Sequence, residues 1–202
     1  MNETSSAPSP LNFPNLLTSL RLILAIALFI VVGIAQAEST SEQNKSQLYW
    51  AALITFVVAA STDWIDGFWA RRYGQVTVLG RIFDPFVDKV IICGTFIFLV
   101  ASPGSQVTAW MAVVVTGREM LVTVLRSFFE QQGTDFSAKM AGKLKMVLQC
   151  LAVVASLYLL TFGGNEPSWL TPTVVTILWA AILLTLYSGG EYLVVAARLM
   201  RQ

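Results

Sequence analysis

The chain has 202 residues, of which 55% are hydrophobic and only 12% are charged, and its formal net charge is +1. In a typical water-soluble domain about a quarter of the residues are charged, so this composition indicates a membrane protein. The near-zero net charge gives no reason to expect nucleic-acid binding, and the lack of histidine excludes histidine metal ligands and histidine bases.

Six apolar segments, each about as long as a helix that crosses a bilayer core, follow one another along the chain. The first of them is too long for the hydrophobic part of a cleaved signal peptide, and no basic cluster precedes it. We expect transmembrane helices at 16–35, 49–71, 83–101, 107–127, 141–162 and 174–199. The sequence therefore predicts an all-α integral membrane protein with six transmembrane helices.

The connections between these segments leave no room for a soluble domain. Three of them are short and rich in Gly, Pro, Ser and Asn, namely 38–46, 102–106 and 163–172. We therefore expect a polar N-terminal extension at 1–12 and one six-helix domain at 13–202.

Basic residues predict the orientation, because cytoplasmic connections carry an excess of Lys and Arg. Six spans place both chain ends and the second and fourth connections on the same side of the membrane. Lys45 is the basic residue of the opposite connections. Most others lie on the first side: Arg71, Arg72, Arg81, Arg126, Lys139, Lys143, Lys145, Arg198 and Arg201. We expect that side, with both termini, to be cytoplasmic.

Four aspartates lie within or beside the second and third apolar segments, where an ionised Asp costs about 2.5–3.5 kcal/mol at a helix centre. Asp63 and Asp66 are three residues apart, and Asp84 and Asp88 are four apart, so each pair shares one helix face. Two antiparallel helices joined by a short basic connection would bring the four acids together. Divalent cations would offset their charge, and all-oxygen ligands favour Mg²⁺ or Mn²⁺.

Two other interpretations of these acids exist. They could form structural ion pairs with the nearby cations, which are Arg71, Arg72, Arg81 and Lys89. They could also line an ion or proton pathway. Small residues on the same helix faces, Gly67, Ala70 and Gly80, leave room for a bulky ligand and favour a binding site. No chain of acids leads from this cluster to the other side of the membrane.

The acids belong to a longer pattern with fixed spacing. It reads Asp63-Trp-Ile-Asp66-Gly67-Phe-Trp-Ala70-Arg71, then eight residues to Gly80, three to Asp84 and three to Asp88. The pattern resembles the signature of the CDP-alcohol phosphatidyltransferase family, D-x2-D-G-x2-A-R-x8-G-x3-D-x3-D, at all eight fixed positions.

This resemblance implies roles for the residues. Two divalent cations would grip the diphosphate of CDP-diacylglycerol, and their ligands would be Asp63, Asp66, Asp84 and Asp88. The pocket for cytidine and diphosphate would include Gly67, Ala70, Arg71 and Gly80. Asp88 would also be the base that takes the proton from the attacking alcohol. A single carboxylate base is sufficient, because phosphoryl transfer depends mostly on positioning and charge stabilisation.

Other motifs resemble the branch of the family whose acceptor is glycerol 3-phosphate. They are Asn12-Phe-Pro14-Asn15-Leu-Leu-Thr18-Ser-Leu-Arg21, Gly117-Arg118-Glu119 followed by Arg126, and Gly142-Lys143-Leu-Lys145. The segment from Leu186 to Tyr192 resembles the last helix of that branch only loosely.

An acceptor that carries its own phosphate needs a cationic pocket, and arginine suits bidentate phosphate binding. Arg118 and Arg126 are eight residues apart and lie on roughly the same helix face, while Lys139 and Lys143 could approach from the adjacent connection. Arg118 would be costly inside the membrane without an anion or Glu119 as its partner. The alternative is that these charges only set the topology.

The resemblance thus implies a homodimeric enzyme in a bacterial cytoplasmic (inner) membrane, which transfers a phosphatidyl group from CDP-diacylglycerol to glycerol 3-phosphate and releases CMP. The substrates and the surrounding membrane lipids are the expected partners. The alternatives are a related enzyme with inositol phosphate, serine or a lipid as acceptor, a cation transporter, and a purely structural membrane protein.

Overall fold

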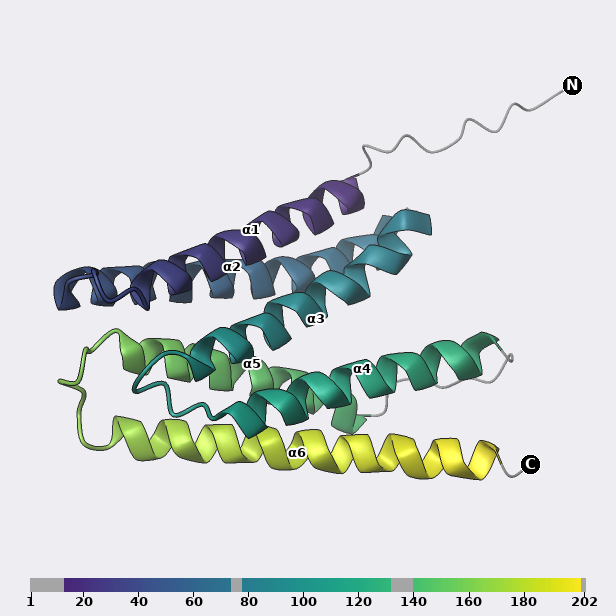
Figure 1. Ribbon diagram of the computed structural model, residues 1–202. Helices are drawn as coiled ribbons and strands as arrows, with labels where there is room; N and C mark the ends of the chain where they lie inside the picture. The colour runs from purple at the N-terminus through teal and green to yellow at the C-terminus, as the bar shows by residue number, and fades with distance from the viewer. Residues whose placement is uncertain (1–12, 74–77, 132–139, 201–202) are drawn as a thin grey trace, which may run out of the picture.

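The structure is a computed structural model that describes residues 13–73, 78–131 and 140–200. Inside its helices the side chains of 13–17, 63–73, 78–85, 130, 140, 141 and 143 are not described. The described residues form six helices and no strand (Figure 1). The helices are α1 (Phe13–Ala35), α2 (Glu42–Tyr73), α3 (Val78–Val100), α4 (Ala109–Gln131), α5 (Met140–Leu160) and α6 (Leu170–Leu199).

Consecutive helices run in opposite directions along one bundle (Figure 1). The connections α1–α2, α3–α4 and α5–α6 lie at one end, whereas the start of α1 and the end of α6 lie at the other. Helix α1 packs on α2 and α3, α5 packs on α2, α3 and α6, and α4 packs on α3 and α6. The end of α2 and the start of α3, which carry the signature, therefore lie at the same end as the start of α1 and the end of α6.

All six expected helices are present, but α1, α2, α3 and α6 begin three to seven residues earlier than predicted. Helix α2 begins at Glu42, so the predicted connection 38–46 is wrong for residues 42–46. The side chain of Ser41 accepts a hydrogen bond from the backbone N–H of Asn44 at 3.4 Å, and Lys45 donates to Glu42 at 2.8 Å. A helix-capping Ser and an ion pair one turn apart stabilise this polar start, which hydrophobicity does not reveal.

Helix α6 begins at Leu170 instead of 174, so the predicted connection 163–172 is wrong for its last residues. Pro172 lies in the first turn of this helix. A proline is tolerated there because the first backbone N–H groups of a helix have no partner within it. The domain boundary predicted at residue 13 stays a prediction, and the extension 1–12 lies outside the described residues.

One large apolar core joins α1, α2, α3, α5 and α6, with a contribution from α4. Phe56 and Phe96 are fully buried in it. Gly94 faces the ring of Phe29, which stacks on Phe98 with 5.1 Å between ring centroids. A smaller cluster of Val122, Phe129, Tyr192 and Ala196 joins α4 to α6 near the end where the chain finishes.

The outer surface of the bundle is strongly apolar. One stripe of α1 consists of Ile23, Ile26, Ile30 and Ile34, each between 50% and 63% exposed. Among the described residues, Thr18–Ala35 and Leu170–Leu199 are long and apolar enough to cross a membrane, and only 33% of each is buried. A core helix of a soluble protein would be mostly buried, so these exposed faces indicate a membrane protein. The other four spans stay predictions.

Candidate functional site

The signature residues lie on both sides of the link between α2 and α3. Asp63 and Asp66 lie in the last three turns of α2, and Asp84 and Asp88 lie in the first three turns of α3. The helical backbone gives each pair the one-turn spacing that the sequence predicts. Asp88 is the one signature residue whose side chain is described; those of Asp63, Asp66, Gly67, Ala70, Arg71, Gly80 and Asp84 lie outside that part of the structure.

Asp88 has a cationic partner from another helix. Nη1 of Arg21, on α1, donates to Oδ1 of Asp88, on α3, at 2.6 Å. The side chain of Arg21 is 2% exposed and that of Asp88 is 27% exposed. A buried guanidinium needs an anion beside it, and Asp88 is that anion for Arg21. The ion pair links α1 to α3 at the last residue of the signature.

This ion pair was missed by the sequence analysis, which considered Arg71, Arg72, Arg81 and Lys89 as partners of the acids. The signal that could have found it is the position of Arg21. It lies five residues into the apolar run 16–35, where a lone charge needs a partner. The sequence does not say which acid that partner is.

A second group of charges lies between α4 and α5. Glu119 is 8% exposed and accepts hydrogen bonds from Nη1 of Arg118 at 3.3 Å and from Nζ of Lys145, which is 4% exposed. The sequence had suggested Glu119 as a partner for Arg118, and this prediction is confirmed. The sequence placed Lys145 in a motif of the glycerol 3-phosphate branch and also among the charges that set the topology, and gave it no partner; in the structure it donates to Glu119 inside the bundle. The group carries two cations and one anion.

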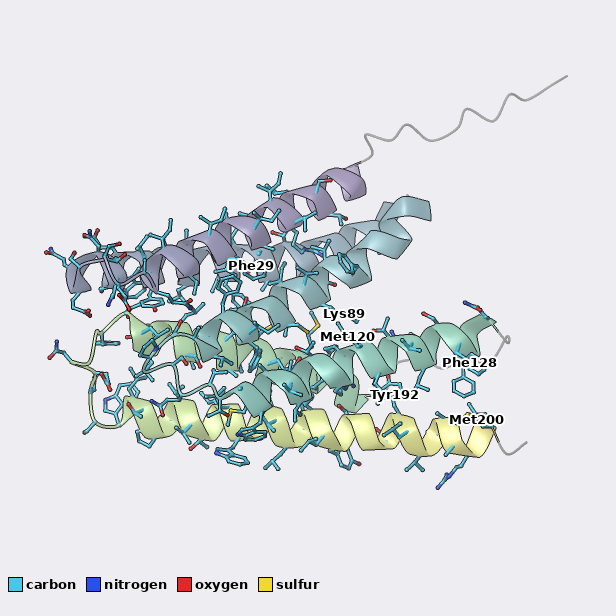
Figure 2. All side chains as sticks on the ribbon, viewed as in Figure 1. Phe29, Lys89, Met120, Phe128, Tyr192 and Met200 are labelled. Carbon is cyan, nitrogen blue, oxygen red and sulfur yellow. The ribbon has the colours of Figure 1, made fainter. Side chains whose placement is uncertain are left out.

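The two arginines predicted to bind the acceptor phosphate meet on one tyrosine of α6. Cζ of Arg118 lies 5.5 Å from the centroid of the Tyr192 ring, and Nη2 of Arg126 donates to Oη of Tyr192 at 3.4 Å. Figure 2 shows Tyr192 between α4 and α6. The structure therefore brings Arg118 and Arg126 to a common neighbour. Lys139 lies outside the described residues, and so does the side chain of Lys143.

The donor atoms of the predicted metal ligands can be compared with the preferences of metal ions. Among the described side chains no group of three His, Cys, Asp or Glu could hold a metal ion, and the side chains of Asp63, Asp66 and Asp84 are not among them. The predicted ligands at the junction of α2 and α3 are all carboxylates, and the chain has no histidine. Oxygen donors of this kind fit Mg²⁺ or Mn²⁺.

Comparison with known proteins agrees with the signature. The family description CDP-alcohol phosphatidyltransferase matches residues 11–187. A Bacillus subtilis protein, CDP-diacylglycerol–glycerol-3-phosphate 3-phosphatidyltransferase, is 34% identical over 187 residues, which are 90% of this chain and 93% of the relative. An Escherichia coli K12 protein of the same name is 30% identical over 184 residues, with the same coverage of both chains. This chain belongs to the CDP-alcohol phosphatidyltransferase family.

Proposed function

We propose that this protein transfers the phosphatidyl group of CDP-diacylglycerol to sn-glycerol 3-phosphate, forming phosphatidylglycerophosphate and CMP in phospholipid biosynthesis. One observation carries the proposal. The complete eight-position signature lies across α2 and α3 in a chain whose relatives, over nine-tenths of its length, have this activity as their name.

The proposed metal ligands are Asp63, Asp66, Asp84 and Asp88, and the cations are two Mg²⁺ or Mn²⁺ ions. Members of the family generally depend on divalent cations. When bound, such ions neutralise the charge of the diphosphate and stabilise CMP as it leaves. Around them, the proposed pocket for the nucleotide and diphosphate consists of Gly67, Ala70, Arg71 and Gly80.

Asp88 is the proposed general base. It takes the proton of the 1-hydroxyl of glycerol 3-phosphate, and the hydroxyl oxygen bonds to the phosphorus that carries diacylglycerol. The bond between that phosphorus and the CMP oxygen breaks, and CMP leaves with the electron pair. Support for this role comes from the contact with Arg21, which holds Oδ1 of Asp88 and so restricts the orientation of the carboxylate. A base must be held within hydrogen-bond reach of the proton that it removes.

The proposed binding site for the acceptor phosphate consists of Arg118, Arg126, Lys139 and Lys143. Arginine forms paired hydrogen bonds with phosphate oxygens. The contacts of Arg118 and Arg126 with Tyr192 support a joint role for these two residues. Glu119 and Lys145 are buried beside Arg118 and form its structural support.

We further propose that the protein lies in the bacterial cytoplasmic membrane as a homodimer. All six helices cross the membrane, and both termini and the site face the cytoplasm, where glycerol 3-phosphate is dissolved. The support for this orientation is the distribution of basic residues in the sequence. CDP-diacylglycerol and the membrane lipids reach the site from the bilayer.

The test uses the purified protein in detergent with CDP-diacylglycerol, Mg²⁺ or Mn²⁺ and a panel of alcohols, with CMP as the measured product. We expect CMP release with glycerol 3-phosphate and little with serine, inositol phosphate or glycerol. Release with serine or inositol phosphate alone would refute the acceptor and leave a related enzyme. Cation flux into vesicles with no CMP release under any condition would refute the enzyme and favour a transporter.

A further inference from the structure

Helix α6 has no part in the signature, and its segment from Leu186 to Tyr192 resembles the family only loosely. In the structure, however, two residues of this segment touch the arginines of α4. Gly189 and Tyr192 are three residues apart, which places them on one face of α6. Both are buried. This face has contacts that neither the signature nor the proposed chemistry explains.

Gly189 lets α6 approach the stem of Arg118. A Cβ atom at this position would lie 3.1 Å from Cγ of Arg118, which is closer than ordinary van der Waals contact. A Cβ atom at the neighbouring Gly190, by contrast, would meet nothing within 4 Å. The missing side chain of Gly189 therefore makes the space in which Arg118 lies.

Tyr192 contacts both arginines with different parts of its side chain. Its ring lies 5.5 Å from Cζ of Arg118, within the range of a cation–π interaction, and its hydroxyl accepts from Arg126 at 3.4 Å. The rise of an α-helix separates the Cα atoms of residues 118 and 126 by about 12 Å. Tyr192 therefore gives two distant side chains a shared contact.

Packing against neighbouring helices restricts the side chain of Tyr192. Its ring packs in the apolar cluster with Val122, Phe129 and Ala196, and a Cβ atom at Gly142 of α5 would lie 3.7 Å from its hydroxyl. The side chain therefore lies where α4, α5 and α6 meet. A long arginine side chain has many rotamers, and ordering it on binding lowers affinity. Contacts made before the substrate arrives remove part of this loss.

We propose that Gly189 and Tyr192 are positioning residues that hold Arg118 and Arg126 ready for the phosphate of the acceptor. The inference rests on the proposed function, because it assigns these arginines to glycerol 3-phosphate. It adds a face of α6 to the proposed acceptor site.

Steady-state kinetics with both substrates test the proposal. Tyr192→Phe keeps the ring and its packing but removes the hydroxyl, and Gly189→Ala moves Arg118. We expect each variant to raise KM for glycerol 3-phosphate by about three- to tenfold, the range expected when one contact with the net strength of an ordinary hydrogen bond is lost. KM for CDP-diacylglycerol and the apparent Tm should stay unchanged. Matched controls on the same helix are Tyr187→Phe, at an exposed site, and Gly190→Ala, which should behave like wild type.

The outcomes separate this inference from the proposed function. An active wild type whose two variants keep the normal KM for glycerol 3-phosphate would refute the positioning role alone. Equal increases in the KM values of both substrates, accompanied by a lower Tm, would assign the two residues to packing and refute it as well. A wild-type protein that releases no CMP with glycerol 3-phosphate would refute the proposed function and this inference together.

Discussion

Glu119 is the buried anion between two cations, Arg118 and Lys145. Removing its negative charge should therefore lower the stability of the folded protein. In Glu119→Gln the shape is kept, but Arg118 and Lys145 lose their negative partner. Two unit charges 3.3 Å apart, the distance from Arg118 to Glu119, attract by about 5 kcal/mol at an effective dielectric constant of about 20. Breaking a buried pair by removing one partner typically costs about 3–5 kcal/mol.

The expected change can be read as a shift of the apparent Tm of the purified protein in detergent. For a chain of this size 1 kcal/mol corresponds to about 2–4 °C, so Glu119→Gln should lower Tm by roughly 6–20 °C. The matched control is Glu42→Gln at the surface pair with Lys45, where the side chain of Glu42 is 77% exposed. Surface pairs contribute about 1 kcal/mol or less, so this control should shift Tm by less than about 4 °C.

A double-mutant cycle separates the ion pair from other effects of the substitution. Adding Lys145→Met to Glu119→Gln removes the buried cation as well, so the double variant should be more stable than Glu119→Gln alone. Equal Tm shifts for Glu119→Gln and Glu42→Gln would refute the reasoning. So would a double variant whose loss of stability is the sum of the two single losses.

The remaining predictions concern the proposed chemistry and the packing. Asp88→Asn should lower CMP release at least 100-fold, the lower range for loss of a general base. Because this change also removes the anion beside the buried Arg21, the apparent Tm should fall, while circular dichroism at the assay temperature should still show the helical content of the wild type. Normal turnover would exclude Asp88 as the base. Chelation by EDTA should stop CMP release, and added Mg²⁺ or Mn²⁺ should restore it; activity that survives chelation would contradict the metal site. Gly94→Ala should lower the free energy of unfolding by about 1–3 kcal/mol, because the added methyl group would clash with the ring of Phe29. Gly117→Ala is the control and should not lower it, because a Cβ atom there would meet nothing within 4 Å.

The family and the helices could be predicted from the sequence because both depend on local spacing. The signature lies within 26 residues, from Asp63 to Asp88, and its pairs of acids are separated by one helical turn. Apolar runs of about 20 residues predict the helices for a similar reason, since the thickness of the bilayer sets their length. The starts of helices were predicted less accurately. The start of α2 at Glu42, for example, depends on a cap and an ion pair in a polar segment.

Side-chain partners from different helices could not be predicted in the same way. The sequence suggested Glu119 for Arg118, which is its neighbour, but not Lys145, which reaches Glu119 from 26 residues away. It proposed Arg118 and Arg126 for the acceptor and gave no role to Tyr192. Each of these contacts depends on how far a helix is rotated about its axis and which helix packs beside it.

The amino-acid sequence by itself determined that this is a helical membrane protein with the signature of its family, because composition and one-turn spacing need no knowledge of packing. Only the tertiary structure decided that Arg21 holds Asp88 across 67 residues and that Tyr192 of α6 contacts both arginines of α4. The physical reason is that a buried charge requires a partner, while the packing of the helices selects which side chain is close enough to be that partner.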